Sequence, residues 1–241
     1  MSKIKFEYNL TKDAYNYARI ILFSTPLGAS KNLDLIPEKV QKEVKKSYKI
    51  HPINHSKLIE MSSHKIFEPI IAYLNAKIEN EVLDYNKRLL ETEWESIENK
   101  YFQRLSELLQ KPVYPANYTC YLTTLYSCPY SEKGNWFMVS AFSSLSNQIY
   151  VICHEFMHLQ FIHWYKNYCL KRKLTDKEFW HIKEVMTFLL NEPEFREIIP
   201  FQDKGYLIHR QLKKRLEKLW KKDKNFKVFL DEVIARKQDY F

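Results

Sequence analysis

Two histidines with a glutamate beside them are the clearest chemical signal in the sequence. His154, Glu155 and His158 form the pattern H-E-x-x-H within the mostly apolar run 150–165. Residues four apart lie on one face of a helix, so both imidazoles can reach the same metal ion. Glu155 lies about 100° further round the helix, where it can accept a proton from a water molecule held at that metal. The pattern therefore predicts a zinc site.

Glu184 is the first choice for a third ligand, because catalytic zinc usually takes three protein ligands and keeps one position open. It follows His158 by 26 residues, which is enough for one helix to end and a second helix to return. Trp180 and Phe188 lie four residues before and after it, so its carboxylate falls on an apolar stripe. A carboxylate in such surroundings needs a partner, and a metal ion is one.

Other polar side chains near the motif have simpler explanations. Glu178 matches a capping box that begins at Thr175, which accounts for it as a helix-start residue. Glu192 and Glu194 flank a proline and are typical of a loop, so they are the reserve candidates for the third ligand. His163 lies about 140° round the helix from the second motif histidine, and we expect it on a different face.

This arrangement resembles the gluzincin metallopeptidases, the zincin clan that includes thermolysin. In its size and in the order of its predicted elements, the chain is most similar to the compact minimal members of that clan. The resemblance covers roughly residues 64–195. It implies one Zn²⁺ per chain held by His154, His158 and Glu184, with Glu155 as general base and acid in the hydrolysis of peptide bonds. It also implies an α+β, predominantly helical zincin-like domain with an active-site helix and a glutamate helix.

The resemblance further implies an exposed edge strand that pairs with the substrate backbone. That strand comprises Trp136, Phe137, Met138, Val139, Ser140 and Ala141. Many gluzincins place an acidic residue where this chain has Phe188, so support for a zinc-bound histidine must come from elsewhere. No motif marks the residue that stabilises the oxyanion, and the candidates are His181, Tyr206 and His209.

Apolar spacing predicts the elements that must hold these residues. Helical patterns cover residues 11–22, 37–48, 64–110, 175–190, 203–220 and 226–237, in addition to the motif helix. The pattern over 64–110 would span about 70 Å as one helix, so we expect it to bend near 79–81 or to split. Residues 118–126 and 136–142 are rich in Thr, Tyr and other strand formers and predict a small antiparallel sheet.

Length and composition favour a mainly helical soluble protein. The 241 residues include only 3 glycines, which argues against barrels, propellers and glycine-rich nucleotide loops. We expect a helical segment over 1–63 and a catalytic domain with C-terminal helices over 64–241, which could also be one continuous domain. The 4 cysteines are too few for a disulfide scaffold, and neither a secretory signal nor a membrane span is evident. These features predict a cytoplasmic location.

A net charge of +9 and the basic run 209–222 support a competing hypothesis. In it, the chain is an inactive or weakly active zincin-fold protein whose basic C-terminal helix binds nucleic acid or an acidic protein. A solvated lysine face explains the same charge more simply. A third hypothesis is a purely structural helical protein in which H-E-x-x-H is accidental. For the peptidase, the expected partners are a peptide or protein substrate and, for a latent enzyme, one of its own terminal segments.

Overall fold

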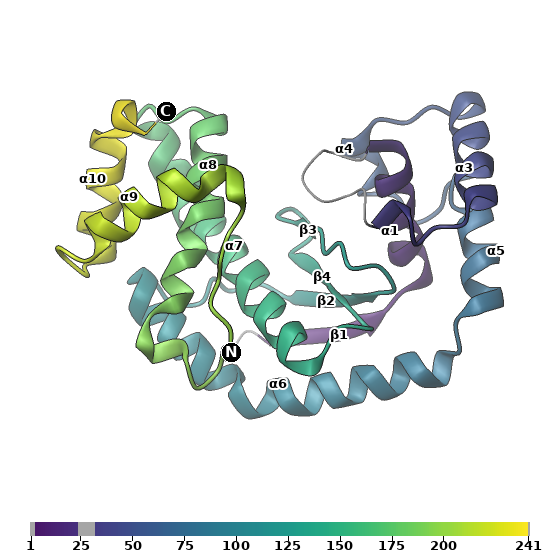
Figure 1. Ribbon diagram of the computed structural model, residues 1–241, viewed down its shortest axis with the longest axis horizontal. Coiled ribbons are helices and arrows are strands. Elements are labelled where there is room, and N and C mark those ends of the chain that lie inside the picture. Colours follow the sequence, from purple (N-terminus) through teal and green to yellow (C-terminus); the bar gives the residue numbers. More distant parts are fainter. Residues whose placement is uncertain (1–2, 24–31, 241) are drawn as a thin grey trace. The chain divides into compact units, whose positions relative to one another are not determined.

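The computed structural model describes residues 3–23 and 32–240 and shows an α+β protein dominated by helices (Figure 1). The described residues divide into two compact units. The sheet unit comprises residues 3–92 and 117–148, and the helical unit comprises residues 93–116 and 149–240. This division differs from the boundary at residue 63 expected from the sequence, because strands from both ends of the sheet unit pair with each other.

The sheet unit contains a mixed four-stranded sheet in the order β1-β2-β4-β3. Its strands are β1 (Ile4–Tyr8), β2 (Tyr118–Thr123), β3 (Tyr130–Ser131) and β4 (Trp136–Ser140). β2 and β4 run parallel, so the predicted antiparallel pairing of these two segments was wrong. The short β3 lies between them in sequence and pairs antiparallel with β4, on the side of β4 that faces away from β2. The chain therefore reverses direction in β3 and runs in the same direction in β4 as in β2.

The prediction that residues 136–141 form an exposed edge strand was also wrong. β4 is an inner strand, between β2 and β3, and all five of its residues are buried. Ala141, directly after it, is buried as well and donates its N–H to the carbonyl of Thr123. The sequence pattern predicts only two strands; β1, whose residues Ile4, Phe6 and Tyr8 alternate with polar ones, was not predicted.

In the described part of the sheet unit, the sheet is accompanied by α1 (Leu10–Phe23), α3 (Glu38–Ile50), α4 (His55–Leu58) and α5 (Glu68–Lys77). α1 begins where the Asn9 side chain accepts the N–H of Lys12, so Asn9 caps this helix. The buried carboxylate of Asp13 ties α1 to β2, because it accepts hydrogen bonds from Thr123 and Thr124. The apolar faces of α1, α3 and α5 pack together into the core of the unit.

The long helical pattern splits in two, as its length predicted. α5 ends at Lys77, and Ile78 adopts an extended conformation before α6 (Asn80–Leu109) begins. The second part of α6 lies in the helical unit, where the Tyr101 hydroxyl donates a hydrogen bond to the carbonyl of Cys153 at 2.5 Å.

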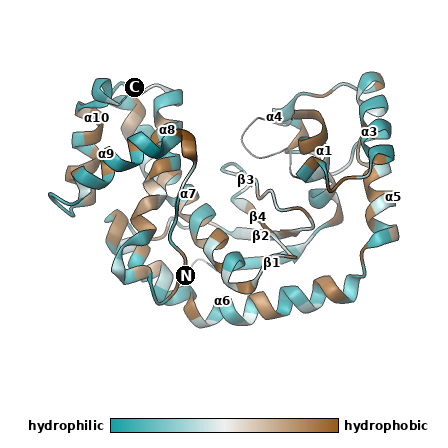
Figure 2. Ribbon diagram, in the orientation of Figure 1, coloured by the Kyte–Doolittle hydropathy of each residue, from teal (hydrophilic) through white to brown (hydrophobic). Residues whose placement is uncertain are grey.

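The helical unit is built round α7 (Leu145–Lys171), whose residues 156–162 are all buried. Figure 2 shows both hydrophobic and hydrophilic residues along this helix. Its other helices are α8 (Asp176–Met186), α9 (Arg210–Trp220) and α10 (Phe226–Ala235), with 3₁₀ turns at Thr187–Asn191, Pro193–Phe195, Leu207–His209 and Lys237–Asp239. Stacked and edge-on rings join α7 to its neighbours, such as Phe161 to Phe179 at 5.4 Å and to Phe226 at 6.2 Å between ring centroids. The capping box at Thr175 and Glu178 is confirmed.

All four cysteines are free thiols, and three of them are buried. Within the described ranges, no helix combines the length and the apolar character that a bilayer crossing requires.

Candidate metal centre

The motif lies on a single continuous helix, as its spacing requires. α7 begins after Ser144, whose hydroxyl accepts the N–H of Asn147 and whose carbonyl accepts that of Gln148. One turn separates His154 from His158, and their ring centroids lie 4.5 Å apart. His158 is 2% exposed, so its imidazole is removed from water. Both imidazoles therefore face one site on the helix, where His158 is buried and His154 is partly exposed.

Glu184 on α8 completes the group. Its Oε2 lies 3.5 Å from Nε2 of His158, and one donor atom from each of His154, His158 and Glu184 lies within 4.8 Å of the others. Two ligands bound at about 2.1 Å to a tetrahedral metal are about 3.4 Å apart. The contact between His158 and Glu184 already has that separation. Among the described residues, these three form the group that could hold a metal ion.

The reserve ligands have other neighbours. Glu192 pairs with Lys224, whose Nζ lies 2.5 Å from its Oε2, and Glu194 is exposed. His163 stacks on the ring of Tyr114 at a centroid distance of 4.3 Å, which agrees with its expected position on another face of α7.

Asp203 is a member of the site that sequence analysis missed. Its Oδ2 lies 3.2 Å from Nδ1 of His154, and its side chain is 1% exposed. The N–H of Gly205 donates to its Oδ1 at 2.7 Å. The Asn191 side chain donates to the backbone carbonyl of Asp203 and accepts its backbone N–H. This carboxylate supplies the support for a histidine that Phe188 cannot give, and it leaves Nε2 of His154 as the atom available to a metal.

The signal for Asp203 was weak. The segment Asp203-Lys204-Gly205 is typical of a turn, but it falls within the helix predicted over 203–220. In the structure, residues 202–206 are non-helical, and a 3₁₀ turn leads into α9 only from Leu207. Gly205 has a φ of +62°, in the left-handed region that glycine adopts at little cost.

Lys183 is the second residue that was missed. It is 2% exposed, and its ammonium forms an ion pair with Oε1 of Glu184. In sequence it is one lysine among many, and only the packing of α8 reveals that it is buried. The site therefore contains a buried positive charge in addition to its histidines and carboxylates.

Burial and charge shift the pKa values of the histidines and carboxylates of the site. Burial raises the pKa of Glu155 to about 7, although the charges of His154 and Lys183 act to lower it. The pKa of His158 falls to about 3 because of burial first and the Lys183 charge second, so this imidazole is neutral at pH 7. Burial alone would raise the pKa of Glu184, but its contacts with His158 and Lys183 hold that pKa well below its usual range.

Asp203 and His154 shift together. Burial acts to raise the pKa of Asp203, yet its hydrogen bond and charge interaction with His154 leave that pKa below the usual range. For His154, burial acts to lower the pKa, but Asp203 and Glu155 outweigh it and the pKa is raised. A neutral His154 that donates Nδ1–H to Asp203 is the tautomer that a metal requires.

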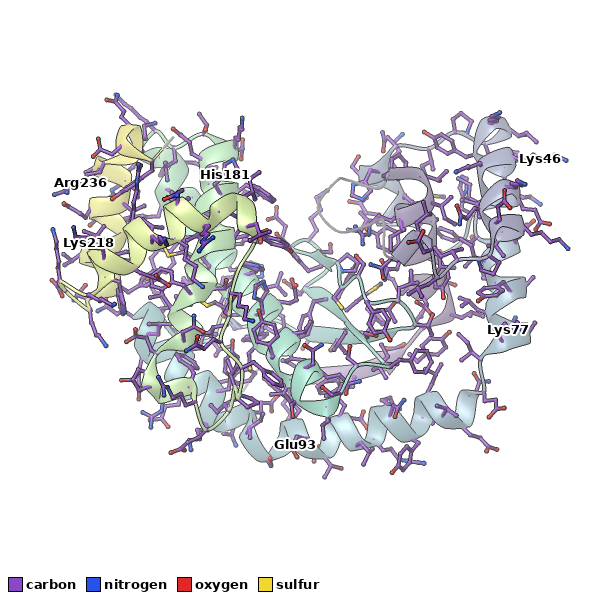
Figure 3. All side chains as sticks on the ribbon, in the orientation of Figure 1. Lys46, Lys77, Glu93, His181, Lys218 and Arg236 are labelled. Atoms are coloured by element: carbon purple, nitrogen blue, oxygen red, sulfur yellow. The ribbon has the colours of Figure 1, made fainter. Side chains whose placement is uncertain are left out.

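Two of the three oxyanion candidates contact each other. Nδ1 of His181 on α8, labelled in Figure 3, lies 2.9 Å from Nε2 of His209 at the start of α9. The Tyr206 ring lies 6.1 Å from that of His209 between centroids. Burial lowers the pKa of both histidines, and the negative charge of Glu184 acts on both in the opposite direction. The two histidines are therefore close enough to Glu184 for its charge to affect their pKa values.

The residues predicted to pair with substrate are in the sheet unit. Residues 136–140 are buried in β4 and Ala141 is buried directly after it, so they offer no open strand edge. On α9, Leu212, Leu216 and Trp220 are buried, whereas Leu219 is only partly buried. Its cations are mostly exposed, including Lys218, which Figure 3 shows on the outer part of the helix.

Comparison with known proteins finds no matching protein family, no similar curated protein and no similar solved structure. The resemblance to gluzincins therefore rests on the motif and on the geometry of its neighbours.

Proposed function

We propose that this protein is a zinc-dependent metallopeptidase of the gluzincin type, with α7 and α8 as the active-site and glutamate helices of a zincin-like domain. The observation that carries the proposal is the convergence of His154, His158 and Glu184 from two helices, with their donor atoms within 4.8 Å of one another. Glu155 lies in the same charge network, next to the ligands rather than among them.

The charge of the site fits a divalent cation. With the histidines neutral, the carboxylates of Glu184 and Asp203 and the ammonium of Lys183 leave a net charge of −1 in a largely buried site, and this becomes −2 when Glu155 is ionised. Uncompensated buried charge is unfavourable, and a single Zn²⁺ neutralises it. Two imidazoles and one carboxylate are also a donor set that zinc favours in catalytic sites.

When bound, zinc supplies polarisation of the attacking water and of the scissile carbonyl. His154, His158 and Glu184 would hold it, and Asp203 would orient His154. Glu155 accepts the proton of the attacking water and passes it to the leaving amine. A pKa near 7 suits a group that must both accept and release a proton at neutral pH.

The decisive experiment measures metal content and turnover in the same set of variants. Purified wild-type protein is expected to bind one zinc per chain, and His154→Ala, His158→Ala or Glu184→Ala to lose it. Glu155→Gln is expected to keep the metal and to lose peptide cleavage by several orders of magnitude, since an amide cannot accept the proton. Glu194→Gln, an exposed change of the same kind, is the matched control.

Two outcomes would overturn parts of this proposal. A wild-type protein that binds no zinc would favour the structural hypothesis, in which Lys183 and His158 alone satisfy Glu184. A protein that binds zinc but cleaves no peptide, and instead binds nucleic acid with strong salt dependence, would favour the binding-protein hypothesis and its basic α9.

A further inference from the structure

Lys183 is a buried cation that the proposed reaction does not use. It lies on α8 directly before Glu184 and is 2% exposed, among the largest side chains of the buried interior. Lysine is rarely buried without a compensating negative group, and here its ammonium contacts Oε1 of Glu184. Its charge also acts on Glu155 and His158. Lys183 therefore belongs to the site rather than to its surroundings.

The two oxygens of Glu184 face different groups. Oε1 contacts the ammonium of Lys183, whereas Oε2 lies 3.5 Å from Nε2 of His158, on the side of the candidate ligands. A carboxylate can bind a metal through one oxygen or through both. Because Lys183 engages Oε1, a single oxygen is left for the cation.

We propose that Lys183 is a positioning residue that restricts Glu184 to binding the metal through Oε2 alone and weakens the site's hold on divalent cations; this inference rests on the zinc site proposed above. The restriction keeps the metal at three protein contacts with an open position for water. The second effect follows from repulsion, because a buried ammonium next to a ligand opposes an incoming cation.

Metal affinity tests the repulsion. Lys183→Met and Lys183→Gln both remove the charge, and Gln keeps a polar group in case the apolar variant does not fold. Competition against a chromophoric chelator should show both variants binding Zn²⁺ about tenfold more tightly than wild type, or better. Lys177→Met removes the same charge from an exposed position on α8 and should leave the affinity unchanged.

Coordination geometry tests the restriction. Co²⁺ substituted for zinc absorbs visible light strongly when four-coordinate and more weakly as the coordination number rises. Wild type should give the strong spectrum, and Lys183→Met a weaker one as Oε1 joins the metal. Unchanged or weaker Zn²⁺ affinity in both Lys183 variants, with the wild-type Co²⁺ spectrum, would overturn this inference while leaving the zinc site intact. Failure of wild type to bind either metal would overturn the zinc site itself.

Discussion

Asp203→Asn is the sharpest single test of the site, because it changes charge and hydrogen bonding with almost no change of shape. In the wild type, Oδ2 faces Nδ1 of His154 at 3.2 Å and Oδ1 accepts the N–H of Gly205 at 2.7 Å. An amide has one oxygen, so its NH₂ group must face one of these two donors. If it faces His154, the imidazole must move its proton to Nε2, the atom that a metal needs.

The expected effect is a loss of zinc affinity of about 10- to 100-fold, typical for the removal of a carboxylate that supports a metal-bound histidine. This corresponds to about 1.4–2.7 kcal/mol of binding free energy. Loss of one negative charge from the buried site acts in the same direction. A large effect is expected because Asp203 is buried, with its side chain 1% exposed, and water cannot replace the lost contact.

The assay is a zinc competition titration with a chromophoric chelator, with circular dichroism and thermal unfolding of the metal-free proteins as controls for folding. Asp176→Asn makes the same chemical change at an exposed position in the first turn of α8. If Asp203→Asn binds zinc within about threefold of Asp176→Asn, Asp203 does not orient His154, and the argument from its geometry is wrong.

Three further predictions concern the metal and the sheet unit. His163→Ala should keep one zinc per chain by elemental analysis, because His163 stacks on Tyr114, outside the ligand cluster; loss of zinc would contradict the ligand set. At a free zinc concentration 100 times its Kd, the helical unit should gain about 2.7 kcal/mol against unfolding, and His154→Ala should gain nothing in thermal melts. Burial raises the pKa of Asp13 from 3.8 to about 6, so its contribution to stability is full below pH 3.8 and is lost as pH rises through about 6. Denaturant titrations between about pH 4 and pH 7 should therefore show wild type losing up to about 3 kcal/mol relative to Asp13→Asn, and parallel profiles would refute the shift.

Much of the candidate metal centre could be predicted from the sequence, because its core is encoded locally. The spacing of His154 and His158 within one helix sets their common face, and the periodicity of α8 sets the face of Glu184. The capping box at Thr175 and Glu178 and the split between α5 and α6 are likewise determined by residues a few positions apart. Local geometry of this kind follows from backbone dimensions, whatever the rest of the chain does.

The remaining features depend on contacts between distant segments. Asp203 reaches His154 from 49 residues away, and β1 pairs with β2 across more than a hundred residues. β4 is an inner strand because β3 covers its other side, a pairing of only two residues on β3 that periodicity cannot reveal. Helical periodicity places Glu184 on α8 but does not indicate that the neighbouring Lys183 is buried beside it. Such features are determined by the tertiary structure. A carboxylate, an ammonium or a strand edge acquires its partner only when packing brings together residues that are distant in the sequence.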